Sequence, residues 1–125
     1  MSLIISFAHT TPAVRARRKK VTRRAWKRRH AELYKVGVPV QGWTRLPRQH
    51  GERFCEVSLI KLPYLESTAD IPEEDYELEG FAYLEEQGLT LGGVKPRDFW
   101  NEWHDRPEIL YVVRFDIISV EAADG

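Results

Sequence analysis

The chain has 125 residues, of which 42% are hydrophobic, 30% charged and 11% aromatic. This composition excludes a disordered protein and indicates a globular one, long enough to bury a core as a single domain over 1–125. The net charge is zero, but residues 1–53 hold 14 Lys and Arg against two acids, and the remainder holds five against 17. Such an asymmetry favours an anionic partner, or simply the pairing of the two halves with each other.

The first part of the chain predicts one strand and two helices. Residues 3–8 form a short apolar run that is typical of a buried strand. Thr11 followed by Pro12 predicts a helix start, with Thr11 as the N-cap and Pro12 in the first turn. Aromatic and apolar residues at helical spacing predict a further helix over 25–35, which Gly37 is placed to end.

The middle of the chain predicts two strands with a loop between them. Residues 38–44 favour a strand, although Pro39 and Gly42 indicate an edge position or a bulge. A loop is expected over 45–51. Apolar and polar residues then alternate along 54–62, which is the period of a half-buried strand.

The last part predicts short helices before a long strand. A capping signal at Asp70 predicts a helix that stops or bends at Gly80. Two more short helices are expected over 81–87 and 97–104. Residues 109–117 alternate along a long strand. Strands at both ends and in the middle, with short helices between them, indicate an α+β domain built on a small, mostly antiparallel barrel.

The cysteine and histidine content indicates a cytoplasmic protein without a metal. The single Cys55 cannot form an internal disulfide and is expected to be buried and inert, as in a reducing compartment. The apolar stretch 3–7 is too short for a signal peptide or a membrane span. The four His show no ligand spacing, so neither a metal nor another cofactor is expected.

One segment combines dense positive charge with a possible nucleophile. Ten of the residues from 15 to 29 are Lys or Arg, and Thr22 lies among them with Lys19 three positions earlier. A Thr hydroxyl becomes a nucleophile when a neighbouring base takes its proton, and an amine can do so only when it is neutral. Taken alone, however, Lys19 is as well explained as a solvated cation, and Thr22 as an ordinary strand or turn residue.

Five short segments, in this order, resemble the ASCH domain family of PUA-like barrels. They are Lys19-Lys20-Val21-Thr22-Arg23-Arg24, Val40-Gln41-Gly42-Trp43, Glu79-Gly80-Phe81, Asp98-Phe99-Trp100 and Val112-Val113-Arg114-Phe115. The resemblance covers residues 4–118 and is greatest to phage and prophage members. It implies an α+β fold with a small, mostly antiparallel PUA-like β-barrel flanked by short helices.

The resemblance also implies a function. One ASCH branch hydrolyses N4-acetylcytidine to cytidine and acetate with a Lys, Thr and Glu triad, which falls here on Lys19, Thr22 and Glu79. The chain is longer between Trp26 and Phe54 than the small amidohydrolases of this branch. PUA-like barrels also commonly bind RNA, so the resemblance implies a nucleoside substrate and leaves RNA as a second partner.

The chemistry of the triad makes two demands on the structure. Lys19 must have a lowered pKa, which crowding by cations and partial burial would produce. Glu79 would orient Lys19, or protonate the departing cytosine amine. Positions i and i+3 face opposite sides of a regular strand, so Lys19 and Thr22 can converge only across a turn or an irregular segment.

Two further residues are candidates for binding the substrate. Arg24 could contact a ribose, a carbonyl or a phosphate, or pair with the acidic half. Trp43 could stack on a pyrimidine or lie in the core, whereas Trp26, Trp100 and Trp103 are expected to be packing residues. A non-catalytic RNA-binding module, or a ribonuclease, remains the alternative to the amidohydrolase. The acyl group, the choice between nucleoside and RNA, and the oligomeric state stay open.

Overall fold

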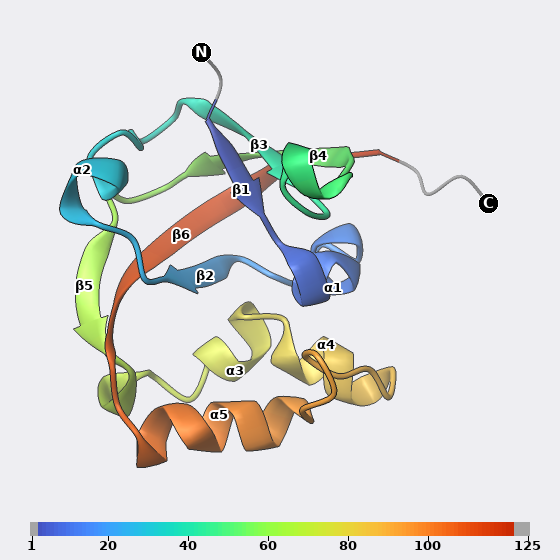
Figure 1. The fold of residues 1–125 in the computed structure, drawn as a ribbon, viewed down its shortest axis with the longest axis vertical. Coiled ribbons are helices and arrows are strands. Elements are labelled where there is room, and N and C mark those ends of the chain that lie inside the picture. The colour runs from blue at the N-terminus through green and yellow to red at the C-terminus, as the bar shows by residue number, and fades with distance from the viewer. Residues whose placement is uncertain (1–2, 122–125) are drawn as a thin grey trace.

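The fold combines a strongly curled sheet with short helices, as seen in a computed structural model that describes residues 3–121 (Figure 1). In chain order the elements are β1 (Ile4–Ser6), α1 (Thr11–Arg15), β2 (Val21–Arg24), α2 (Arg28–Ala31), β3 (Pro39–Trp43), β4 (Arg53–Leu59), β5 (Tyr64–Ser67), α3 (Asp75–Leu78), α4 (Phe81–Glu86), α5 (Pro96–Asp105) and β6 (Ile109–Val120). Short 3₁₀ turns precede α1, β4 and α3. The secondary structure is therefore mixed α and β, as the sequence predicts.

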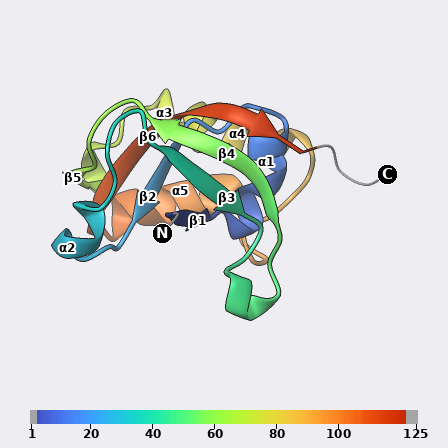
Figure 2. The same ribbon diagram turned by 90° about the horizontal axis from the view of Figure 1, so that it is seen from above.

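The six strands of the described residues form one sheet in the order β1-β3-β4-β6-β2, with β5 also paired to β6. Every pairing is antiparallel except that of β1 with β3. The long strand β6 joins the two parts of the sheet, because its first half pairs with β2 and β5 and its second half with β4. Seen from above, the sheet arches into a half-barrel (Figure 2).

Two apolar clusters hold this arrangement together. The larger lies inside the curled sheet and includes Phe7, Val57 and Phe115, all at most 3% exposed. The smaller, around Phe81 and Trp100, packs α3, α4 and α5 together below β2 (Figure 1). Each fully buried side chain of this size stabilises the fold by roughly 1.5–3 kcal/mol.

The strands predicted over 3–8, 38–44, 54–62 and 109–117 are confirmed as β1, β3, β4 and β6, and the helices over 81–87 and 97–104 as α4 and α5. Of the two explanations offered for Pro39 and Gly42, the bulge is right, because the register of β3 against β4 shifts between Gly42 and Trp43. As a whole β3 is not an edge strand, since it lies between β1 and β4, but β1 pairs only with residues 41–43, so Pro39 is paired on the β4 side alone.

Other expectations need correction. The helix predicted over 25–35 is only the single turn α2, because the aromatic residues around it stack, Trp26 on Tyr34 with ring centroids 4.4 Å apart. The N-cap of α1 is Thr10 rather than Thr11, since a 3₁₀ turn runs directly into the helix. The helix expected from Asp70 begins only at Asp75, after another 3₁₀ turn.

Candidate active site

The end of α1 places Lys19 at the centre of the molecule. Arg17 adopts the left-handed conformation with φ 60°, and the backbone N–H groups of Arg18 and Lys19 both donate to the carbonyl of Ala13. This geometry stops the helix and reverses the chain. The N–H of Lys20 then donates to the carbonyl of Leu78 at 2.7 Å, which ties the segment after α1 to the end of α3.

Gly80 brings Glu79 to the same place. Gly80 has φ +90°, and a Cβ added to it would lie 2.5 Å from the Cβ of Ala13. Only glycine adopts this conformation without strain and allows so close an approach. The chain can therefore leave α3 and start α4 directly against α1, with the side chain of Glu79 turned toward Lys19. The bend predicted at Gly80 is confirmed.

Lys19 and Glu79 form a buried pair. The Nζ of Lys19 donates to the backbone carbonyl of Glu79 at 2.8 Å and to its Oε1 at 3.0 Å. The two residues are only 1% and 2% exposed. Burial lowers the pKa of Lys19 below its ordinary value of 10.5, and the nearby positive charges of Arg24 and Arg23 act in the same direction, while Glu79 opposes them. The lowered pKa is in the direction that a base would need.

Thr22 joins this pair at one cavity. It lies on β2 and is 4% exposed, and its Oγ1 accepts a hydrogen bond from the Nε of Arg24 at 3.1 Å. Lys19, Thr22, Arg24 and Glu79 all line a cavity of about 230 Å³. Lys19 lies before β2, in the irregular segment that follows α1. The side chains of Lys19 and Thr22 can therefore reach the same cavity, as their spacing in the sequence requires.

Aromatic side chains also line the cavity. Phe7, Phe81, Phe99 and Trp103 line it together with Leu91 and the exposed His9. Trp103, expected to be a packing residue, thus also faces the cavity, whereas Trp100 lies in the helical cluster. A cavity lined by both ionisable groups and flat apolar side chains suits a planar ligand that carries a polar group.

Arg23, which the sequence places in the basic run, is a buried partner of Glu79. Its side chain is 1% exposed, and Nη1 donates to the Oε2 of Glu79 at 2.7 Å. Its Nη2 donates to Asp75 at 2.5 Å and to Glu66 at 3.0 Å. Burial acts to lower the pKa of Arg23, but the three carboxylates outweigh it and raise that pKa.

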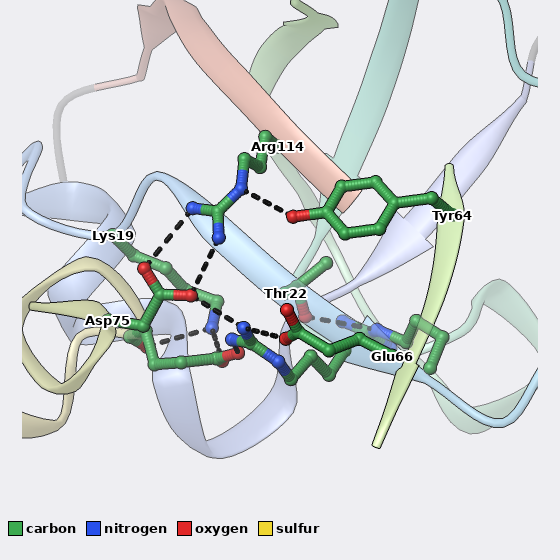
Figure 3. Close-up of polar contacts among 9 residues, drawn as sticks. Lys19, Thr22, Tyr64, Glu66, Asp75 and Arg114 are labelled. Carbon is green, nitrogen blue, oxygen red and sulfur yellow. Dashed lines mark hydrogen bonds and ion pairs between the residues drawn. The ribbon is translucent and has the colours of Figure 1, made fainter. Parts of the chain in front are cut away.

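Asp75 is held in turn by Arg114, whose guanidinium lies between Tyr64 and Asp75 (Figure 3). Arg114 donates to Asp75 at 2.8 Å and 3.2 Å, and to the hydroxyl of Tyr64 at 3.0 Å. Lys19, Arg23, Arg114, Glu66, Asp75 and Glu79 therefore form one ion-pair cluster. Sequence reasoning missed all but Lys19 and Glu79, since the cluster joins β2, β5, α3 and β6. The only indication of this cluster in the sequence is Arg114, a cation on the polar face of the strand predicted over 109–117.

Trp43 lies elsewhere. Of the residues that the structure describes, those lining the cavity do not include it. Its side chain is partly exposed, and its Nε1 donates to the Oε1 of Gln41 at 3.0 Å. The backbone carbonyl of Trp43 accepts a hydrogen bond from the N–H of Phe7 at 2.9 Å, and Phe7 lines the cavity.

The basic run does not form one solvated face. Lys19 and Arg23 are buried, and Arg18 pairs with Glu77 and Glu86. Full exposure is confined to four of the ten cations, namely Arg17, Lys27, Arg28 and Arg29. The asymmetry of charge thus partly reflects pairing between the two halves of the chain. Cys55 is buried as predicted, and burial raises the pKa of its thiol to about 12.

Among residues 3–121, no group of three His, Cys, Asp or Glu side chains could hold a metal ion. Nor does any helix there have the length and apolar character that crossing a membrane demands.

Comparison with models of known protein families, with curated proteins and with solved structures gives no match to this chain. The assignment of a function therefore depends on the residues of the cavity and on the resemblance of the five short segments.

Proposed function

We propose that this protein is an amidohydrolase that removes the acyl group from N4-acetylcytidine or a related N4-acylated cytidine, and that its half-barrel is a PUA-like barrel of the ASCH family. The observation that carries the proposal is the meeting of Thr22, Lys19 and Glu79 at one cavity. These are the residue types that the ASCH amidohydrolases use, and Glu79 comes from a part of the chain distant from Lys19 and Thr22.

The hydrogen bonds of Lys19 suit the role of a base. A neutral amine has two N–H groups and one lone pair. Among the described residues, Lys19 has two acceptors, the carbonyl and the Oε1 of Glu79. The lone pair is then left for the proton of the Thr22 hydroxyl, while Arg24 donates to the same oxygen and stabilises it as it becomes negative.

The reaction would proceed in two steps. The Oγ1 of Thr22 attacks the acyl carbon and its proton passes to Lys19. The bond between that carbon and N4 breaks, and Lys19 returns the proton to the departing amine of cytidine. Water then attacks the resulting ester with Lys19 again as base, which releases the carboxylate and restores Thr22.

Glu79 would orient Lys19 in both steps. Its two carboxylate oxygens accept hydrogen bonds from Lys19 and Arg23, an arrangement that suits an anion. Of the two roles that the sequence allows, we therefore favour orientation over protonation of the leaving amine.

The size of the cavity favours a small, planar group. About 230 Å³ lies below the usual range of roughly 300–1,000 Å³ for pockets that enclose a drug-sized ligand. An acylated pyrimidine could enter between the aromatic walls while its ribose stayed outside. Phe81, Phe99 and Trp103 would then contact the base or the acyl group.

The test is direct. The purified protein is incubated with N4-acetylcytidine, and the cytidine and acetate formed are quantified by chromatography. Thr22→Val is the matched control, because valine keeps the shape of threonine and has a methyl group in place of the hydroxyl. We expect equimolar products from the wild type and none from the variant. Absence of hydrolysis by the folded wild type, or equal rates in both proteins, would rule out the proposal.

An RNA-binding function is the second candidate, and one observation favours it. A second cavity, of about 380 Å³, shares Ser6 and Arg24 with the first and is also lined by Trp26 and His30. The exposed cations Lys27, Arg28 and Arg29 follow Trp26 directly in the chain. Aromatic and basic side chains side by side are typical of surfaces that bind single-stranded nucleic acid.

A further inference from the structure

The ion-pair cluster contains equal numbers of both charges. Lys19, Arg23 and Arg114 are its cations, and Glu66, Asp75 and Glu79 are its anions. If Lys19 acts as a base, it must lose its proton, and the cluster is then left with one more anion than cations. An unpaired carboxylate is very costly in the interior, so the charge of Glu79 needs another partner.

Arg23 is in position to be that partner. It holds the Oε2 of Glu79, the oxygen that Lys19 does not use, and with its other nitrogen it reaches Asp75. Asp75 is itself fixed by two hydrogen bonds from Arg114. No hydrogen bond joins Arg24 to Glu79 among residues 3–121, and Arg24 bonds to Thr22 instead.

We propose that Arg23 is a positioning residue of this site, which bridges Glu79 to Asp75 and so keeps Glu79 charge-paired while Lys19 is neutral. This inference rests on the proposed function. Arg114 supports it from the far side, because it fixes the carboxylate of Asp75 to which Arg23 is bound (Figure 3). Arg23 also lines the cavity. The role that we assign to it acts through Glu79 and Lys19 and not on the substrate.

The inference predicts how Lys19 should titrate. The charged groups that face Lys19 are Glu79 at the end of α3 and Arg23 and Arg24 on β2, and His9 lines the same cavity. When Arg23 is replaced by Gln, Glu79 has Lys19 as its only cationic hydrogen-bond partner and holds the proton of the ammonium more strongly. The titration midpoint of Lys19 should rise by about one pH unit or more, which is the usual effect of an opposite charge, here that of Glu79, on a neighbouring group.

The experiment is NMR of the protein with ¹³C-labelled lysine, which gives six side-chain signals to follow against pH. The signal of Lys19 is assigned with Lys19→Met. Arg18→Gln is the matched control, because it removes a neighbouring cation that pairs with Glu77 and Glu86 at the surface. We expect the Lys19 midpoint to rise in Arg23→Gln and to stay in place in Arg18→Gln.

A second variant serves if Arg23→Gln does not fold. The double variant Arg23→Gln/Asp75→Asn removes one buried cation and one buried anion together, and Glu79 loses the same partner. The midpoint of Lys19 should again rise. A Lys19 midpoint that is the same in the wild type and in whichever variant folds would overturn the inference.

Kinetic measurements distinguish failure of the inference about Arg23 from failure of the proposed function. In the folded variant the pH at which kcat is half-maximal should move with the Lys19 midpoint, while KM for N4-acetylcytidine changes little. A Lys19 midpoint that moves while kcat keeps its wild-type pH dependence would overturn the positioning role. A wild type that does not hydrolyse the substrate, with the Lys19 midpoint still sensitive to Arg23, would overturn the proposed function and leave the charge pairing in place.

Discussion

Lys19 donates two hydrogen bonds to Glu79, a residue 60 positions later in the chain, at 2.8 Å to its backbone carbonyl and 3.0 Å to its carboxylate. The backbone bond fixes the amine independently of the state of the carboxylate. Because both atoms belong to the residue just before Gly80, the geometry of the amine depends on the bend at that glycine.

Removal of the Thr22 hydroxyl should abolish hydrolysis. Thr22→Ala should lower kcat for N4-acetylcytidine by at least about 10³-fold, since loss of a nucleophile costs several orders of magnitude. Thr22→Ser keeps a hydroxyl and should retain measurable activity. Cytidine release at saturating substrate is the measurement, with thermal unfolding as a check on folding. Full activity in Thr22→Ala would assign the attack to water or another residue.

The activity should rise with pH as Lys19 loses its proton. The pKa of Lys19 is lowered from 10.5, chiefly by burial, so the neutral amine is populated at lower pH than in a free lysine. The rate should therefore be low in acid, increase through the lowered pKa and level off above it. Lys19→Arg should be inactive at every pH, because guanidinium stays protonated. Initial rates over a pH series, corrected for spontaneous hydrolysis, provide the check, and a rate that falls with rising pH would exclude Lys19 as the base.

The sequence predicts much of the framework because its signals are local. Alternation along 54–62 and 109–117 identifies β4 and β6, and Gly80 identifies the bend before α4. The strands β2 and β5 were not predicted, since each has only four residues and owes its form to pairing with β6. Their assignment depends on a partner distant in the chain.

The candidate site was predicted only in part, for a similar reason. Lys19, Thr22 and Glu79 were named from short segments, and the structure places all three at one cavity. Arg23 was counted as a surface cation, because nothing in a run of basic residues shows which of them point inward. Trp43 was considered for base stacking, but an aromatic residue on a central strand can face away from a cavity beside that strand.

Gly80→Ala should destabilise the fold and disturb the site together. Alanine at φ +90° is strained, which costs about 1–3 kcal/mol, and its Cβ would also collide with Ala13. Urea titration should show a lower midpoint than for the wild type. Gly88→Ala is the control, because that glycine also has positive φ, at +67°, but no atom lies within 4 Å of the added Cβ. A loss of stability in Gly80→Ala no larger than that in Gly88→Ala would contradict the role of the close approach.

The stabilisation that Asp75 gives to the protein should be lost at acid pH. Burial acts to raise the pKa of Asp75, but hydrogen bonds and charge from Arg114 and Arg23 lower it below the ordinary value of 3.8. Its contribution is therefore full above 3.8 and is lost as the pH falls through the lowered pKa. Asp75→Asn removes the carboxylate that pairs with the buried Arg23 and the partly buried Arg114. Breaking a buried pair costs about 3–5 kcal/mol, and we expect at most this loss at neutral pH, because Arg23 keeps its other two carboxylate partners.

The measurement is urea unfolding of the wild type and Asp75→Asn at neutral pH and at a series of acid pH values. The difference between the two proteins should shrink as the medium is acidified. Asp70→Asn is the control, since Asp70 is exposed in the 3₁₀ turn before α3. A difference in the free energy of unfolding that does not vary with pH would mean that the charge of the Asp75 carboxylate does not stabilise the cluster.

RNA binding should depend on the exposed cations at the start of α2. Lys27, Arg28 and Arg29 are exposed in succession, and each can neutralise one phosphate. Affinity for a single-stranded RNA should fall steeply with salt, and the change of all three to Gln should reduce the slope of log K against log salt by about 2. Hydrolysis of uncharged N4-acetylcytidine should respond little to salt. Arg23 does not belong in this test, because it is buried in the ion-pair cluster.

A matched control distinguishes the effect of these three cations on RNA affinity from the effect of the overall charge of the protein. The control changes three exposed cations in the acidic half of the chain to Gln, namely Lys95, Arg97 and Arg106. Both triple variants lose the same charge, so a general electrostatic effect would weaken RNA binding equally in the two. We expect a large loss of affinity only for the variant changed at the start of α2, measured by fluorescence anisotropy at low and at physiological salt. Equal losses, or no binding at low salt by the wild type, would mean that the cations at the start of α2 do not form an RNA-binding surface.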